Sequence, residues 1–336
     1  MILFRDDREI RPRAFWRLLF QTVLYLVGIT LLGSLSFTAF ALSRGMSLGS
    51  ETTESLATSP SFLAINGVAS LAATIISIWL AGRYFDRRPF SGFGMCLKDR
   101  DWWFDLGFGL SLGASLMTGI FLLELSAGWI EVTGTFETPG GGSFLSAILA
   151  PAILFLCVGI YEELISRGYQ LTNLAEGLNY PSLGPRGAIL LAWVLSSSIF
   201  GFFHLANPGA TLVSTVNIAF AGLLLGVGYV LTGRLAIPIG LHITWNFFQG
   251  NVFGFPVSGL EPIGATFLTI EQGGPLLFTG GAFGPEAGLL DIVAALIGSL
   301  LICLWVRARY GKATLETSIA EPPVGRVEER EASAED

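Results

Sequence analysis

The sequence predicts an all-α, polytopic membrane protein of about eight transmembrane helices. Hydrophobic residues make up 52% of the 336 residues and charged residues only 13%, whereas soluble domains carry roughly 25% charged residues. The mean hydropathy is +0.64. This composition leaves little room for a large soluble domain, and the sequence has no basic stripe that would suit nucleic acid.

Eight apolar segments are candidates for spanning helices, since a helix needs about 20 apolar residues to cross a bilayer. The fourth is expected to continue as a helix beyond its apolar part, through Arg167 to about Leu178. The seventh is the weakest, because a proline and three polar side chains interrupt it. The segments cover about residues 18–42, 62–83, 104–129, 144–163, 187–206, 210–232, 235–254 and 287–307.

Lysine and arginine lie almost entirely on one side of this eight-helix arrangement. Of the 19 such residues, only Arg44 falls on the other side. By the positive-inside rule the Arg/Lys-rich side is cytoplasmic, and it includes both termini. We expect residues 1–313 to form an integral membrane bundle. Residues 314–336, which are acidic and contain proline, are expected to form a disordered cytoplasmic tail.

Two pairs of glycines lie four residues apart within the predicted helices. They are Gly109 with Gly113, and Gly222 with Gly226. Small residues at this spacing allow the backbones of neighbouring membrane helices to approach closely. The two pairs mark helix contacts or are ordinary glycines of membrane helices.

The stretch VGIYEELISRG, residues 158–168, places two glutamates and an arginine at the end of an uncharged segment. Ionisable groups at bilayer depth are costly and usually mark function. Glu163 and Arg167 are four residues apart, so they share a helix face and can neutralise each other. Glu162 projects about 100° away and has no local partner. Glu162 is therefore the candidate general base.

The only two histidines of the chain both lie in apolar segments. His204 occurs in SSSIFGFFHLANPG and His242 in IPIGLHITWNFFQG. Helical spacing places Phe200 on the face of His204, and Asn246 on the face of His242. An intramembrane histidine can be a core residue bonded to a backbone carbonyl. Alternatively, one histidine holds a water beside the glutamate while the other, with Asn246, stabilises an oxyanion.

No cysteine or serine stands in a triad-like context, which favours direct attack by water on an acyl group. A metal site is the alternative, because Glu162, His204 and His242 form a zinc-type ligand set with an open position. However, an HExxH motif is absent, and the ligands would come from three helices. The cofactor is therefore open: none if the glutamate is the base, and otherwise a divalent metal such as zinc.

Three motifs in chain order resemble the CAAX protease and bacteriocin-processing family of intramembrane endopeptidases, which includes the type II CAAX prenyl endopeptidases. They are Glu162-Glu163-x-x-x-Arg167, Phe200-x-x-x-His204 and His242-x-x-x-Asn246, and they cover about 85 residues. The stretch PLLFTGGAFGPEAGLL, residues 275–290, also resembles bacterial members. The resemblance implies an eight-helix membrane fold with its site inside the bundle and a protease-like core at about 144–254.

The resemblance also implies roles for these residues. Glu162 and His204 are expected to activate water, and His242 and Asn246 to serve the oxyanion, with Glu163, Arg167 and Phe200 in support. The implied activity is hydrolysis of a peptide bond in a membrane-associated or lipidated protein or peptide, within a bacterial plasma membrane. Family members have been described both as metalloproteases and as metal-free glutamate proteases.

Two other functions are compatible with the composition. One is a non-catalytic scaffold or bacteriocin-immunity-type protein on the same fold. The other is a transporter that uses the buried charges as a proton relay, although we find no repeats or broken helices in matching halves. One feature opposes a shared site: Glu162 lies near the cytoplasmic end of its segment and His204 near the outer end of the next. Continuation of the fourth helix to about Leu178 would remove this offset.

Overall fold

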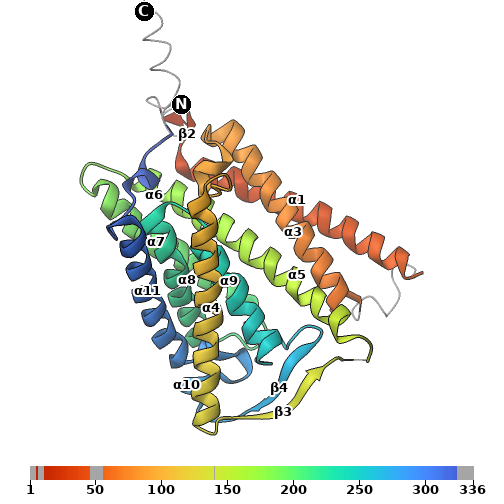
Figure 1. Ribbon diagram of the computed structural model, residues 1–336. Helices are drawn as coiled ribbons and strands as arrows, with labels where there is room; N and C mark the ends of the chain where they lie inside the picture. The colour runs from red at the N-terminus through yellow and green to blue at the C-terminus, as the bar shows by residue number, and fades with distance from the viewer. Residues whose placement is uncertain (1–4, 7–10, 46–55, 140, 324–336) are drawn as a thin grey trace, which may run out of the picture.

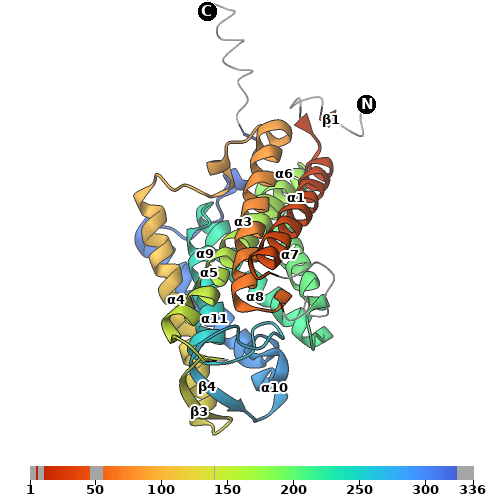
Figure 2. The same ribbon diagram turned by 90° about the vertical axis from the view of Figure 1, so that its right-hand side faces the viewer.

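The structure, a computed structural model, describes residues 5–6, 11–45, 56–139 and 141–323. Long helices pack side by side, and a small sheet lies at the end of the bundle opposite the chain termini (Figure 1). Figure 2 shows the same arrangement from the side. The main helices are α1 (Ala14–Ser43), α3 (Pro60–Ala81), α4 (Arg100–Ser126), α5 (Phe144–Glu163), α6 (Thr172–Leu178), α7 (Gly184–Phe203), α8 (Leu212–Thr232), α9 (Ala236–Phe247) and α11 (Leu289–Tyr310).

Shorter elements extend or connect these helices. Three are π-helical: η1 (Gly82–Asp86), η3 (Leu164–Leu171) and η5 (Phe248–Val252). The others are η2 (Phe90–Phe93), η4 (His204–Ala206), α10 (Leu276–Thr279), η6 (Gly281–Phe283), η7 (Pro285–Ala287) and η8 (Thr317–Ala320). The strands are β1 (Arg5–Asp6), β2 (Arg11–Pro12), β3 (Ile130–Glu137) and β4 (Thr266–Gln272).

Seven helices of the described part are long and apolar enough to cross a membrane. They match the predicted segments except the seventh, where α9 and η5 form a shorter helix. That helix nevertheless joins the two ends of the bundle. Arg234, just before α9, pairs with Asp99 at 2.6 Å, and Asn251 of η5 donates to the carbonyl of Ala265 beside β4 at 2.7 Å. The predicted all-α polytopic membrane fold is confirmed.

The chain from Phe144 to Leu178 is one helical unit of 35 residues, made of α5, η3 and α6. The predicted continuation beyond the apolar segment is therefore confirmed. Glu162 lies near the middle of this unit rather than at its end, which removes the offset from His204. Immediately after Glu163 the helix widens into a π-helical stretch, a feature often found at functional sites.

Both predicted glycine pairs lie at helix contacts. A Cβ atom at Gly109 would overlap the carbonyl of Ile237 in α9, and one at Gly113 would overlap that of Leu241. These two glycines therefore let α4 and α9 touch through their backbones, as small residues do in membrane bundles. Gly222 and Gly226 of α8 also make room for α7: a Cβ atom at Gly222 would press on Cα and Cβ of Ser197, and one at Gly226 would overlap the Trp193 ring.

Large apolar side chains cover the outward faces of the helices. Leu31 of α1 is 65% exposed and Leu296 of α11 is 67% exposed. Exposed apolar surface of this extent marks contact with a membrane or a partner. Together with the seven apolar helices, it identifies an integral membrane protein.

The end of the bundle that holds both termini contains a network of ion pairs, here called the arginine cluster. Arg17 lies 3.1 Å from Asp86 Oδ1 and 2.8 Å from Glu176 Oε2. Arg11 lies 3.2 Å from Glu176, and Arg88 pairs with the other oxygen of that carboxylate. These contacts join β2 and α1, the end of η1 with the residues after it, and α6. The arginine cluster thus ties together three segments that are distant in sequence.

The opposite end of the bundle carries a two-stranded antiparallel sheet that the sequence did not predict. Strands β3 and β4 are antiparallel, with Ile130 opposite Gln272 and Glu137 opposite Thr266. A bulge between Val132 and Gly134 shifts the register. The segment 255–286, which lies between the last two predicted helices, therefore has its own structure.

Two further expectations are corrected. Residues 314–323 are not disordered: Ala320 is 1% exposed, and its carbonyl accepts a hydrogen bond from Asn179 Nδ2 at 3.0 Å. Any disordered tail begins at residue 324 or later, and 324–336 lie outside the described residues. Arg167, counted with the cytoplasmic side, is instead buried within the helical unit 144–178.

Candidate active site

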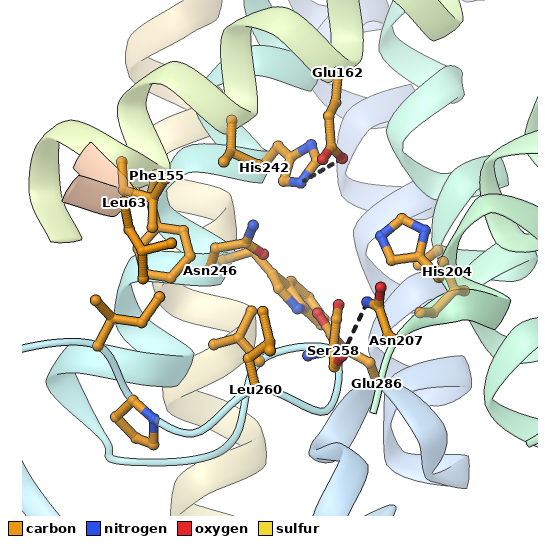
Figure 3. A pocket seen from close by; sticks show the side chains of 18 of the residues that line it. Leu63, Phe155, Glu162, His204, Asn207, His242, Asn246, Ser258, Leu260 and Glu286 are labelled. Carbon is orange, nitrogen blue, oxygen red and sulfur yellow. Dashed lines mark hydrogen bonds and ion pairs between the residues drawn. The ribbon is translucent and has the colours of Figure 1, made fainter. Parts of the chain in front are cut away.

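A cavity of about 830 Å³ lies between α5, α7, α8 and α9 and is bordered at one end by the segment after η5 (Figure 3). Much of its wall is apolar, with Phe155 and Leu241 among the lining side chains. The four residues predicted to be catalytic all line it: Glu162, His204, His242 and Asn246. The structure therefore gathers side chains from α5, α9 and the end of α7 around one space.

Glu163 lies directly behind the cavity wall and is fully buried. Its Oε1 accepts a hydrogen bond from Arg167 Nη1 at 2.8 Å, which confirms the predicted pair, and one from His242 Nδ1 at 2.8 Å. A carboxylate that is paired with arginine only accepts hydrogen bonds, so His242 Nδ1 carries the proton. Nε2 of the neutral imidazole then faces outward as an acceptor.

Arg167 is fixed by three different contacts. Besides Glu163, its Nη2 donates to the carbonyl of Gly222 at 2.8 Å, and its guanidinium carbon lies 4.6 Å from the centre of the Phe200 ring. A Cβ atom at position 222 would lie 3.3 Å from Nη2, so glycine leaves room for the guanidinium. The Phe200 ring also packs against His204, with ring centres 4.8 Å apart. Arg167 and Phe200 thus support the site from behind.

Glu162 points into the cavity, with 23% of its side chain exposed. Its Oε2 lies 3.8 Å from His242 Nε2, which is too long for a hydrogen bond. A water molecule bonded to both atoms would fit such a separation. Figure 3 shows the two side chains turned toward each other at one end of the cavity.

His204 lies at the end of α7, where the helix tightens into η4. Its Nδ1 is 2.8 Å from the carbonyl of Phe200, so this nitrogen carries the proton. The sequence allowed such a backbone-bonded histidine, yet its ring also lines the cavity, across from Asn246 (Figure 3). Among the described residues Glu162 contacts His242 and makes no contact with His204. The predicted pairing of Glu162 with His204 is therefore not found in this geometry.

Asn246 follows His242 by one turn of α9 and is 7% exposed. Its amide has no hydrogen-bond partner within the described residues, and Figure 3 shows it facing the cavity. Buried amides are normally satisfied, so an unused donor here needs an explanation. A ligand that brings an oxygen atom to this position would supply the partner.

Two residues of the cavity were missed by the sequence analysis. Glu286 of η7 is 7% exposed, and its Oε2 accepts hydrogen bonds from the Ser258 amide at 2.6 Å and the Ser258 hydroxyl at 2.8 Å. Burial raises the pKa of Glu286, and the bonds from Ser258 oppose that rise. The only sequence signal was the stretch 275–290, whose resemblance to bacterial family members contains this glutamate.

The three residues of the alternative zinc set do not form a metal centre. In the described part of the chain, no group of three or more His, Cys, Asp or Glu side chains is placed to hold an ion. Nδ1 of His242 is bonded to Glu163, and Nδ1 of His204 to a backbone carbonyl. The geometry therefore gives the metalloprotease prediction no support, and we derive no step through a metal.

Comparison with protein families supplies an independent result. A model described as type II CAAX prenyl endopeptidase, Rce1-like, matches residues 144–248, which include every residue of the three motifs. Searches of curated proteins and of solved structures found no match. The family match supports a peptidase of the intramembrane CAAX kind. Residues 144–248 of this integral membrane protein thus carry the Rce1-like type II CAAX prenyl endopeptidase signature that the three motifs predicted.

Proposed function

We propose that the protein is an intramembrane endopeptidase that hydrolyses a peptide bond of a membrane-associated protein or peptide with a water activated by Glu162. The observation that carries this proposal is the pair of Glu162 and His242, 3.8 Å apart on the wall of a cavity. His242 is held by a buried carboxylate, Glu163, which is itself neutralised by Arg167. Such a chain of contacts fixes the tautomer of a working histidine.

The water lies between Glu162 Oε2 and His242 Nε2 and donates a hydrogen bond to each. Glu162 removes one proton as the water oxygen bonds to the carbonyl carbon of the substrate, which gives a tetrahedral intermediate. The carbon–nitrogen bond then breaks, and Glu162 returns the proton to the departing amine. A positioned general base of this kind contributes typically about 100- to 10,000-fold in rate.

Asn246 stabilises the negative charge that develops on the carbonyl oxygen. Its free amide donor is already oriented by α9, so no reorganisation is needed at the moment of reaction. His204 lies on the opposite wall, where its Nε2 accepts a hydrogen bond from the substrate. These assignments exchange the predicted roles of the two histidines, because His242 is the one beside Glu162.

The cavity opens toward the end of the bundle that carries β3 and β4. Exposed residues line this mouth, among them Thr58 before α3, Pro139 after β3 and Glu261 after η5. The arginine cluster occupies the other end. Glu162 precedes Glu176 of that cluster by roughly 20 Å of helix, within a bilayer core of about 30 Å. If the arginine-rich end is cytoplasmic, substrates reach Glu162 from the extracytoplasmic side of a bacterial plasma membrane.

The proposal is tested with purified protein in lipid nanodiscs and a library of internally quenched peptides. We expect cleavage by the wild-type protein, none by Glu162→Gln, and full activity of Glu271→Gln, which changes an exposed glutamate of β4 outside the cavity. A metal chelator should leave the rate unchanged. Equal cleavage by the wild-type and Glu162→Gln proteins would contradict the proposal.

A further inference from the structure

The ionisable side chains that line the cavity are three carboxylates, two histidines and one tyrosine, Tyr161. Glu162, Glu261 and Glu286 all contribute to the wall, whereas no lysine or arginine does so among the described residues. The nearest structural cation, Arg167, is buried behind Glu163, and both its terminal nitrogens are bonded. The described wall of the cavity therefore offers no arginine or lysine to a substrate.

The two histidines also present acceptors to the cavity in their neutral form. Nδ1 of His242 donates to Glu163, and Nδ1 of His204 donates to the Phe200 carbonyl. Nε2 of each ring is then the unprotonated nitrogen. Among the described side chains of the cavity wall, Asn246 is buried and has an unused amide donor.

Glu286 is held rigidly at the end of the cavity away from Glu162 (Figure 3). Its Oε2 is used by two hydrogen bonds from Ser258, while Oε1 has no partner within the described residues. Ser258 has a φ of 50°, and its carbonyl accepts a hydrogen bond from Asn207 at 3.0 Å. Because the Ser258 turn is fixed from both sides, the free oxygen of Glu286 has a defined position.

We propose that Glu286 is a specificity-determining residue that binds an N–H or ammonium group of the substrate, and that the cavity disfavours a free carboxylate. A carboxylate inside would meet several acceptors and carboxylates in an apolar surrounding, without a cation to compensate. The substrate is then an uncharged or cationic peptide segment cut at an internal bond, rather than a chain end with its terminal carboxylate in the cavity.

This inference deepens the proposed function, but binding tests it separately from cleavage. Three fluorescently labelled, alanine- and leucine-rich peptides of the same length are used: one ends in a carboxylate, one in an amide, and one in an amide preceded by two lysines. Their dissociation constants are measured by fluorescence anisotropy with wild-type protein in nanodiscs. We expect the amide to bind about tenfold more tightly than the carboxylate, and the lysine peptide at least as tightly as the amide.

Variants assign the preference to Glu286. In Glu286→Gln the amide oxygen can still accept the bonds from Ser258, so the turn is kept while the charge is removed. We expect the tenfold preference to fall to about twofold, mainly through tighter binding of the carboxylate peptide. Glu271→Gln is the matched control, because it removes the same charge from the same end of the molecule but outside the cavity, and it should retain the preference.

The wild-type comparison decides the inference even if Glu286→Gln does not fold. Equal affinity of wild-type protein for the carboxylate and amide peptides would overturn it. A preference that survives unchanged in a folded Glu286→Gln variant would remove Glu286 from specificity. If only the proposed function is wrong, the result differs: the protein would still bind the amide peptide more tightly, but it would cleave no peptide.

Discussion

The arginine cluster and the candidate active site are both built from buried charged residues, but they differ in how their carboxylates are satisfied. In the cluster, Asp86 accepts from Arg17 and from Tyr169, and Glu176 accepts at both oxygens from arginines. In the site, Glu163 Oε2 has no partner in the described structure, and Glu162 has no short ion pair: it interacts with the Tyr161 side chain and lies 3.8 Å from His242. The cluster uses its carboxylate oxygens to join helices, whereas the site leaves polar atoms unused.

This difference indicates which group serves stability and which serves chemistry. Buried polar atoms without partners are costly, and more so where no water reaches them. Ionisable groups at membrane depth usually mark functional sites, where a substrate or water supplies missing contacts. We therefore expect mutations to separate the two regions: those in the site should lower turnover, and those in the cluster should lower stability.

The largest expected effect is on catalysis. Glu162→Gln keeps the size of the side chain but removes the base, so kcat should fall by about 100- to 10,000-fold. The melting temperature in nanodiscs should stay within error, because Glu162 makes no short ion pair. Near-normal turnover of the Glu162→Gln variant would contradict the assignment of catalysis to the site.

Arg167 contributes both to the stability of the fold and to the geometry of the active site. Arg167→Ala leaves Glu163 as an unpaired buried carboxylate and removes the contacts to Gly222 and Phe200. Breaking a buried pair by removing one partner costs about 3–5 kcal/mol. We expect a large drop in thermal stability together with lost activity, measured by differential scanning fluorimetry and peptide cleavage.

The double variant Glu163→Gln/Arg167→Met tests the pairing directly. It removes both charges, so its stability should exceed that of Arg167→Ala, although His242 loses its carboxylate. If the double variant were no more stable than Arg167→Ala, the ion pair would not be the cause of the loss.

A smaller effect is expected in the arginine cluster. Glu176→Gln keeps the size of the side chain but removes its charge and replaces one of its two acceptor oxygens by an NH2 group. The bonds from Arg11, Arg17 and Arg88 are therefore weakened. Hydrogen bonds to charged groups contribute about 1.5–3 kcal/mol, and this is the loss of stability we expect. At temperatures where the variant is folded, kcat should equal the wild-type value. A lowered kcat with unchanged melting would show that the cluster is coupled to the chemistry.

The comparison also separates what sequence could and could not predict. The pair of Glu163 with Arg167 follows from helix periodicity alone, because the two residues are four apart on one helix. The contact between Glu163 and His242 joins residues 79 positions apart. It depends on how α5 and α9 are rotated against each other, and no local pattern encodes that rotation.

Local patterns failed in the same way at the end of the bundle that carries β3 and β4. Strand β3 follows α4 directly, and its partner β4 lies far along the chain, so neither strand showed a hairpin signal. The sequence did not predict a role for Glu286, because its hydrogen-bond partner, Ser258, lies in a different turn of the same segment. Spacing predicted which residues form the site, whereas tertiary packing determined which of them touch.

The last prediction involves no loss of activity or stability and concerns which end of the molecule faces the cytoplasm. Cys96, Cys157 and Cys303 are first replaced, and single cysteines are then placed at Glu131 of β3 or at Lys312, both exposed. The positive-inside rule places the arginine-rich end inside. An impermeant maleimide should therefore label position 131 in intact cells, but position 312 only after the membrane is opened. The reverse pattern would turn the cavity mouth toward the cytoplasm, and the proposed extracytoplasmic route to Glu162 would be wrong. Because each substituted position makes no contact with the cavity, cleavage measured in parallel confirms that the labelled protein is the folded one.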